Sequence, residues 1–286
     1  MTDIHPLLEQ RDMLGEGPVW CPVEQALYWV DIRKPAVYRY HPEDRRLSSW
    51  TMPNLVGSLA LRRDGGLLVA LAERLAFFEP ATGAVETVAP LPAGLRCNDG
   101  KCDRRGRFWV GTMHDAEREP LGALYRLDGD RRLSELATGL VIPNALAWSP
   151  DDRVMYHADS FHHTIFAYAF DAAGGGLGER RVFATLRPGI GPDGATVDAE
   201  GFLWNAEYGA GRLVRYAPDG RIDRTVALPV SQPTSCAFGG AKLDVLYITS
   251  SRQRMSADAI AREPLAGGLF ALDVGVRGLP EPRFAG

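Results

Sequence analysis

Short apolar runs recur along this chain, each bounded by turn residues. The clearest example is residues 191–204, where Gly-Pro-Asp-Gly leads into Ala-Thr-Val-Asp, a Glu-Gly turn follows, and an apolar run surrounds Trp204. Weaker copies, aligned on Asp193, place five other residues in the same phase: Glu16, Gly57, Asn98, Asn144 and Thr234. Successive spacings are 41, 41, 46, 49 and 41 residues. A period of roughly 40 to 50 residues predicts radial repeats, because one small sheet cannot bury both its faces alone.

Six repeats of this length occupy residues 1–286, so we expect one all-β domain, a six-bladed β-propeller with four-stranded blades. The first repeat illustrates the blade, with strands near residues 15–20, 26–30, 36–40 and 46–50. Residues 4–12 are too few for a blade, but they include apolar side chains that need cover. We expect this segment to complete the last sheet, so that N- and C-terminal segments pair, close the ring and bring the termini together.

Two segments depart from the repeat. The third repeat contains an insert, His114–Pro120, which is either a rim or lid over one mouth of the channel or a solvated loop. Its charged residues are Asp115, Glu117, Arg118 and Glu119. The sixth repeat contains an Ala-rich segment, Ser256–Arg262, which predicts a short helix.

Composition supports a turn-rich β protein, since the chain has 45% hydrophobic residues, 31 Gly and 20 Pro. A net charge of -4 without blocks of like charge predicts no nucleic-acid partner. No basic leader precedes an apolar segment, and no window approaches the ~18 apolar residues of a membrane span. We therefore expect a soluble cytoplasmic protein without a membrane partner, a monomer or a weak homodimer. Its four cysteines have no metal-ligand spacing and should be structural free thiols: Cys21, Cys97, Cys102 and Cys236.

The residues in equal phase carry the candidate chemistry. In a propeller the innermost strands run side by side around the axis, so Glu16, Asn98, Asn144 and Asp193 should converge at one end of the channel. Two carboxylates and two amide oxygens in a confined place predict a divalent cation site. The alternative is that these polar side chains line a channel filled with ordered water.

The same residues resemble a known family. The segments Leu14–Pro18, Arg96–Lys101, Gly111–Met113, Pro143-Asn144 and Gly191–Gly194 are similar, in order and spacing, to those of the regucalcin/gluconolactonase family. That family also includes senescence marker protein and luciferin-regenerating enzyme. The resemblance covers nearly the whole chain. It implies a six-bladed propeller that binds one divalent cation, and an enzyme that hydrolyses sugar lactones to aldonic acids.

Carried over by position, the resemblance implies that Glu16, Asn144 and Asp193 bind the metal and that Asp193 is also the general base. Arg96 and Asn98 would contact substrate hydroxyls, and Glu117 or Glu119 could add hydrogen bonds. The ion stays open among Ca, Zn, Mg, Mn and Fe(II). The expected substrate is an aldono-1,4- or 1,5-lactone of five or six carbons, rather than a long acyl lactone.

Two positions depart from the family pattern. Ala145 stands where family members commonly have Gly after the ligand Asn, so a positive φ there would be costly. His157-Ala158 stands where Thr or a second aromatic residue is common. Neither change alters an implied ligand.

Other polar residues have weaker roles. Asp99 and Lys101 could orient Asn98 or form a salt bridge at a turn, and His114 could reach the mouth of the pocket. His162-His163 predicts an exposed turn. Asp159-Ser160 has no supported histidine partner, which disfavours a Ser-His-Asp hydrolase.

Two alternative functions stay open at this point. One is a calcium-binding regulatory protein without dedicated catalysis. The other is a phosphotriesterase-like hydrolase on the same propeller. The substrate contacts implied for Arg96 and Asn98 argue against a protein that only binds calcium.

Overall fold

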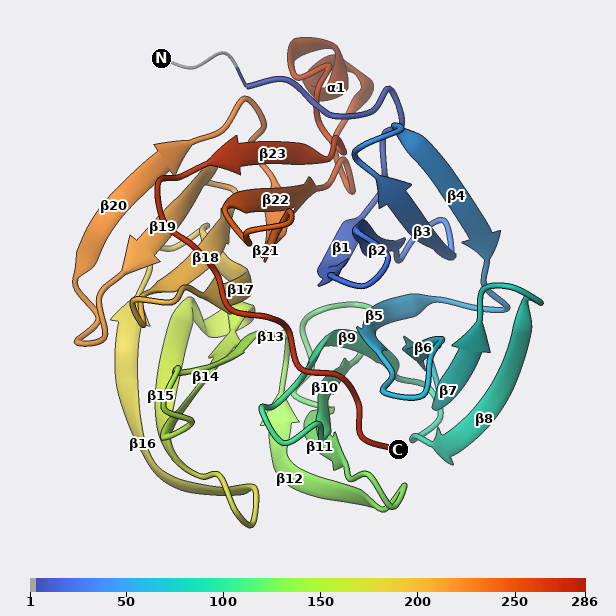
Figure 1. Cartoon of the computed structure of the whole chain (residues 1–286). Coiled ribbons are helices and arrows are strands. Elements are labelled where there is room, and N and C mark those ends of the chain that lie inside the picture. Colours follow the sequence, from blue (N-terminus) through green and yellow to red (C-terminus); the bar gives the residue numbers. More distant parts are fainter. Residues whose placement is uncertain (1–3) are drawn as a thin grey trace.

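Small antiparallel sheets surround a central channel in the computed structural model, which describes residues 4–286 (Figure 1). The described residues form five four-stranded sheets and one three-stranded sheet, and within each sheet the strands follow sequence order. The first three blades contain β1 (Gly15–Cys21), β2 (Ala26–Asp31), β3 (Ala36–His41), β4 (Arg46–Thr51); β5 (Val56–Leu61), β6 (Leu67–Leu71), β7 (Arg74–Glu79), β8 (Ala84–Pro90); and β9 (Arg96–Cys102), β10 (Phe108–Met113), β11 (Gly122–Leu127), β12 (Leu133–Leu140).

Blades four and five repeat this arrangement, and blade six is shorter. They contain β13 (Pro143–Trp148), β14 (Val154–Asp159), β15 (Thr164–Asp171), β16 (Gly176–Thr185); β17 (Gly191–Val197), β18 (Leu203–Tyr208), β19 (Arg212–Tyr216), β20 (Ile222–Ala227); and β21 (Pro233–Gly239), β22 (Val245–Ser250), β23 (Phe270–Asp273). A 3-10 turn, Ser160–His162, follows β14, and the predicted helix is present as α1 (Ala257–Arg262). The predicted six-bladed propeller is confirmed.

The apolar core lies between neighbouring blades. In residues 4–286 the buried apolar side chains form six clusters, one at each interface between two blades. This packing explains the sequence pattern: inner strands such as β5 are buried along their whole length, whereas outer strands such as β20 are mostly exposed. The tryptophans that recur along the repeats are buried in or beside these clusters: Trp20, Trp29, Trp109, Trp148 and Trp204.

The ring closes between blade six and blade one. Trp20 of β1 stacks on Tyr247 of β22, with ring centroids 5.6 Å apart, and Leu7 and Leu8 pack against the same cluster. Pro6 forms a β-bridge with Phe270, and the Leu7 amide donates to the Leu269 carbonyl at 2.7 Å. The N-terminal segment therefore lies beside β23 and covers the outer edge of the last sheet, as predicted.

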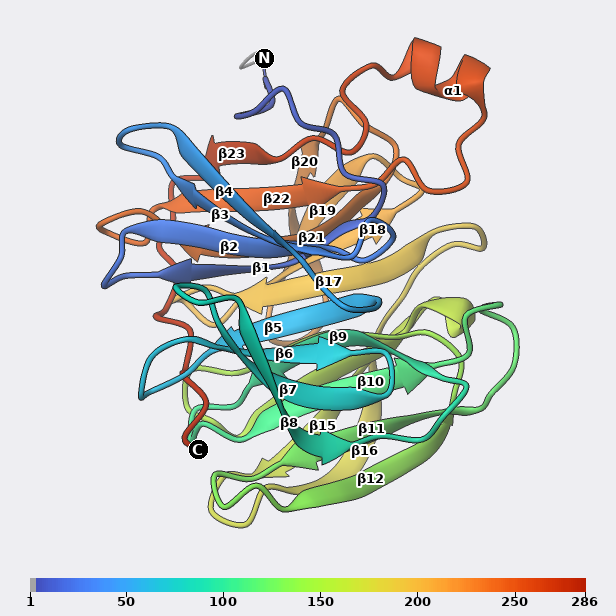
Figure 2. The same ribbon diagram turned by 90° about the vertical axis from the view of Figure 1, so that its right-hand side faces the viewer.

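The expectation that the two termini meet is wrong, because the chain continues past β23 across the channel. We call residues 277–286 the strap. Gly278 bridges to Asp198 in blade five, and the Phe284 amide donates to the Leu61 carbonyl in blade two. Phe284 is fully buried between blades two and three. The strap and α1 lie on opposite faces of the ring (Figure 2).

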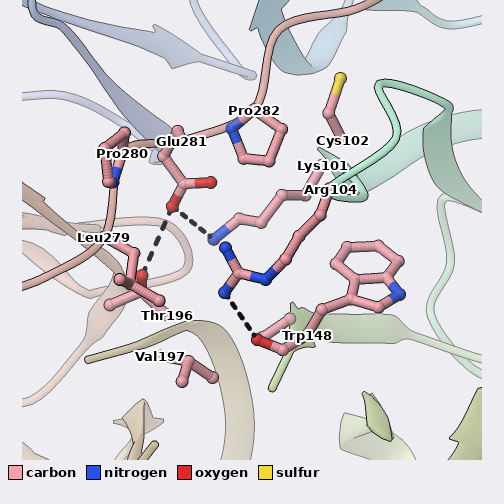
Figure 3. A pocket seen from close by; sticks show the side chains of 11 residues that line it. Lys101, Cys102, Arg104, Trp148, Thr196, Val197, Leu279, Pro280, Glu281 and Pro282 are labelled. Carbon is pink, nitrogen blue, oxygen red and sulfur yellow. Dashed lines mark hydrogen bonds and ion pairs between the residues drawn. The ribbon is translucent and has the colours of Figure 1, made fainter. Parts of the chain in front are cut away.

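The strap closes one mouth of the channel (Figure 3). Glu281 pairs with Lys101, with 3.5 Å between Oε1 and Nζ, and accepts a hydrogen bond from Thr196 Oγ1 at 3.4 Å. Only about 30 Å³ of cavity is left beneath these side chains. Access to the channel is therefore from the opposite mouth.

All four cysteines are buried free thiols, as predicted. Within residues 4–286, no helix has the length and apolar character needed to cross a membrane.

Candidate active site

A cavity of about 520 Å³ lies at the open end of the channel. Four of its lining residues come from the beginnings of inner strands: Glu16 in β1, Asn98 in β9, Asn144 in β13 and Asp193 in β17. The structure thus brings together the four polar residues of equal phase. The cavity is also lined by Leu14, Arg96, Glu117, Ile142, Ser160, Phe161, His163, Gly189, Gly191, Tyr208, Gln253 and Arg254.

The remaining two ring positions do not contribute side chains to the cavity. A Cβ at Gly57 would clash with the Cys97 carbonyl of β9, so the close approach of two inner strands requires glycine there. Thr234 is fully buried, and its hydroxyl donates to the Gly15 carbonyl at 2.5 Å. At Gly57 the ring is therefore closed by backbone packed against backbone. At Thr234 the side-chain hydroxyl connects blade six to blade one.

Bulges direct the polar side chains into the channel. The pairing of inner and second strands shifts register directly after Glu16, after Asn144 and across Asp193. Each bulge adds one residue to the inner strand and turns its side chains relative to the partner strand. In a regular strand without a bulge, successive side chains would point to the two faces of the sheet, which pack against the neighbouring blades.

Glu16 and Asp193 form the floor of the cavity. Both side chains are buried, and their carboxyl groups are close enough to interact directly. Burial, with a smaller repulsion from Asp99, raises the pKa of Glu16 to about 8. Burial followed by repulsion from Glu16 raises the pKa of Asp193 well above its ordinary value. Two buried carboxyls this close cannot both ionise without a compensating positive charge.

A hydrogen-bond network fixes the amides beside this floor. Asn98 Nδ2 donates to Asn144 Oδ1 at 2.9 Å and to the Pro143 carbonyl at 3.0 Å. Asn144 Nδ2 donates to Ser160 Oγ at 2.8 Å, and that hydroxyl donates to the Pro192 carbonyl at 2.7 Å. Both amides are thereby oriented with their oxygens identified. Ser160 serves this network, in agreement with the prediction that it is not a triad nucleophile.

The charged insert forms a rim over the cavity, as one of the two interpretations predicted. Buried Arg96 donates to Asn98 Oδ1 at 2.7 Å and to Asp115 Oδ1 at 2.7 Å. Burial lowers the pKa of Arg96, and its ion pairs with Asp115 and Glu117 oppose that effect. Glu117 lines the cavity, and its backbone has a positive φ of 58°.

Several residues singled out in the sequence lie elsewhere. Glu119 is exposed and does not line the cavity. His114 does not line it either. Neither Asp99 nor Lys101 hydrogen-bonds Asn98: Asp99 accepts from the Leu146 amide, and Lys101 donates to the Ala195 carbonyl. His163 follows the predicted turn, but its ring also lines the cavity.

Sequence patterns missed several cavity residues. Tyr208 ends β18, Phe161 lies in the turn after β14, and Arg254 lies in the loop before α1. Phe161 is 46% exposed, which is unusual for a large apolar side chain and could be recognised only once its place at the mouth was known. None of the three occupies the repeat phase that identified the floor.

Ala145 has the left-handed backbone conformation that its position after the Asn144 bulge requires, with φ of 56°. Gly17 occupies the equivalent position after Glu16, with φ of 54°. A side chain in this conformation costs about 1–2 kcal/mol. The family departure at Ala145 is therefore a strained residue next to the floor.

We expect Ala145→Gly to be about 1–2 kcal/mol less destabilising than Ala147→Gly, because only the first change relieves this strain. Both alanines are buried in β13 and belong to the same apolar cluster, so both changes remove a buried methyl group. Urea denaturation of the two variants measures the difference in free energy of unfolding. Equal losses would show that Ala145 is unstrained.

Comparison with known proteins identifies the family. The model for the "SMP-30/Gluconolactonase/LRE-like region" matches residues 14–252. The chain belongs to this family.

Its relatives include enzymes named for sugar lactones. The chain is 39% identical to 6-deoxy-6-sulfogluconolactonase of Pseudomonas putida, with 98% of each chain covered. It is 41% identical to L-arabinolactonase of Azospirillum brasilense, covering 100% of this chain and 99% of the relative. A crystal structure of regucalcin from Agrobacterium tumefaciens, described as a calcium-binding protein, has a TM-score of 0.94 and 31% identity, covering 99% and 97%. The similarity to the SMP-30/gluconolactonase family is therefore present both in the sequence and in the fold.

The floor residues of this SMP-30/gluconolactonase family member fit a divalent cation. Residues 4–286 contain no group of three or more His, Cys, Asp or Glu side chains placed to hold a metal. The floor instead combines the Glu16 and Asp193 carboxyls with the Asn144 amide oxygen, and hard divalent ions prefer such oxygen donors. Within the described residues Asn144 Oδ1 accepts one hydrogen bond, which leaves its second lone pair available. A cation between the two carboxyls would also offset the repulsion between them.

Proposed function

We propose that this protein hydrolyses an aldono-1,4- or 1,5-lactone to the aldonic acid, with one divalent cation held by Glu16, Asn144 and Asp193. The observation that carries the proposal is the buried Glu16–Asp193 pair at the floor of a cavity with hydrogen-bonding walls. The names of the two lactonase relatives support a sugar lactone as the substrate class.

The reaction adds water to the lactone carbonyl. Glu16, Asn144 and Asp193 would hold the divalent cation, which would supply Lewis-acid chemistry for the lactone carbonyl and the attacking water. We assign Asp193 as the base that accepts the water proton, a role worth about 10²- to 10⁴-fold in rate. A bond forms between water oxygen and carbonyl carbon, the bond to the ring oxygen breaks, and the proton ends on that oxygen as a new hydroxyl. The carboxylic acid then releases a proton to solvent.

The walls orient the sugar. One terminal nitrogen of Arg96, Nη2, makes only a long contact of 3.5 Å to Glu117 Oε1, so this nitrogen can donate to a substrate hydroxyl. Asn98 lies between Arg96 and Asn144 and connects the hydroxyl-binding wall to the floor. The strap seals the far mouth, so water and substrate reach the floor from one side.

We expect gluconolactone and a pentonolactone to be hydrolysed with kcat/KM at least ~10²-fold above that for an acyl-homoserine lactone, because a site that hydrogen-bonds hydroxyls rejects ligands without them. Acid release with a pH indicator measures all three rates. Paraoxon tests phosphotriester hydrolysis in the same assay.

The outcomes separate the candidate functions. Preference for the acyl lactone would overturn the sugar assignment, and preference for paraoxon would favour the phosphotriesterase. Calcium binding without turnover of any substrate would favour the regulatory protein.

A further inference from the structure

A continuous chain of side chains runs from the floor of the cavity to its mouth. Asn144 contacts Asn98, Asn98 contacts Arg96, Arg96 contacts Glu117, and Glu117 Oε2 accepts a hydrogen bond from Arg254 at 2.8 Å. Exposure rises along this wall: Arg96 is 4% exposed by its side chain, Glu117 14% and Arg254 58%. Arg254 therefore marks the end of the wall that is farthest from the reacting carbonyl.

The rim carries an excess of one positive charge. Three guanidinium groups, from Arg33, Arg96 and Arg254, meet only two carboxylates, from Asp115 and Glu117. The other wall of the cavity adds no acid at this level, as it is formed by Ile142, Phe161, His163 and Gly189. A negatively charged group bound at the mouth would neutralise this excess positive charge.

Arg254 has donors to spare for such a group. Among the described residues, it hydrogen-bonds only Glu117, and it does so through one of its terminal nitrogens. A guanidinium has five N–H donors in a planar fork that suits carboxylate, sulfonate and phosphate oxygens. Its ion pair with Glu117 holds the guanidinium at the mouth, so little freedom is lost when an anion binds.

The cavity has room for a substituted sugar. Its volume of about 520 Å³ lies within the roughly 300–1,000 Å³ of sites that take drug-sized ligands, which are larger than an unsubstituted pentono- or hexonolactone. The space between Glu16 and Asp193 at the floor and Arg254 at the mouth can hold a lactone that carries a substituent on its exocyclic carbon.

We propose that Arg254 determines specificity by binding an anionic substituent on the exocyclic carbon of the sugar lactone. The inference rests on the proposed lactone hydrolysis. The shared chemistry is a carboxylate, sulfonate or phosphate group, each of which pairs with a guanidinium.

Gluconolactones that differ only at C6 test the proposal. The probes are gluconolactone, its neutral 6-O-methyl ether, 6-phosphogluconolactone and 6-deoxy-6-sulfogluconolactone, and glucaro-1,4-lactone supplies a carboxylate. Each is assayed with the wild-type protein, Arg254→Gln, Arg254→Lys and the control Arg153→Gln. Arg153 is 84% exposed, lies in the turn after β13 and does not line the cavity.

We expect at least one anionic lactone to exceed both neutral ones in kcat/KM by tenfold or more in the wild-type protein. Arg254→Gln should lower this ratio at least tenfold through KM, Arg254→Lys should retain part of it, and Arg153→Gln should leave it unchanged. Because Arg254 is exposed, KM for the anionic substrate should also rise with salt. The phosphate, sulfonate and carboxylate probes show which anion is bound.

Two results would overturn the inference while leaving lactone hydrolysis intact: a ratio near one in the wild-type protein, or a ratio that Arg254→Gln does not change. Absence of turnover with every lactone would instead reject the proposed function. Circular dichroism of each variant verifies that the propeller is folded.

Discussion

Replacing Asp193 by Asn is expected to lower kcat for gluconolactone at least ~10²-fold, even at saturating divalent ion. The amide has a similar volume and keeps an oxygen for the cation, but it cannot accept the proton of the attacking water. The backbone around Asp193 should be preserved, because its carbonyl is held independently by Asn205 Nδ2 at 2.6 Å. Steady-state kinetics at increasing metal concentration measures the loss.

Glu16→Gln is the matched control, since Glu16 is the other carboxyl of the same buried pair. Its change removes negative charge from the floor but leaves the proposed base in place. Its kcat should therefore recover in part as the metal concentration is raised, whereas that of Asp193→Asn should not. Full recovery of Asp193→Asn at saturating metal would show that this residue is a ligand only, and that the base must be sought elsewhere.

The fold could be predicted because every repeat must bury both faces of one small sheet against its neighbours. The second strand of a blade, as in β2, β6 and β10, is buried along its whole length and rich in apolar residues. Turns separate these strands, so the same pattern recurs from blade to blade along the sequence. Equal phase then placed Glu16, Asn98, Asn144 and Asp193 around one axis without any knowledge of their contacts. Gly57 occupies the same phase but has no side chain, and only the structure shows why: the backbone of Cys97 lies too close for a Cβ atom.

The strap could not be predicted from a local pattern. Leu279-Pro280-Glu281-Pro282 has no strand alternation, and its two prolines remove backbone donors from any ladder. Its position depends on contacts far away in sequence, above all Phe284 with blades two and three and Glu281 with Lys101. The expectation that the termini meet failed for this reason.

The rim was only partly predictable. Charge in the insert suggested contacts with substrate, but the sequence could not tell Glu117 from Glu119. The contacts of Glu117 with Arg96 and Arg254 make the distinction, and these partners are 21 and 137 residues away in sequence. Arg254 itself lies outside the repeat phase, so only the folded ring places it at the mouth.

Removal of divalent ions is the measurement that tests the proposed mechanism most directly. The proposed mechanism needs a divalent cation as the Lewis acid, because the carboxyl groups of Glu16 and Asp193 supply no such electrophile. We expect gluconolactone hydrolysis by protein purified without added metal to fall at least ~10²-fold after exhaustive chelation, and to return when about one divalent ion per chain is restored. Elemental analysis of the same samples gives the stoichiometry. Undiminished hydrolysis with metal content near zero would contradict the account.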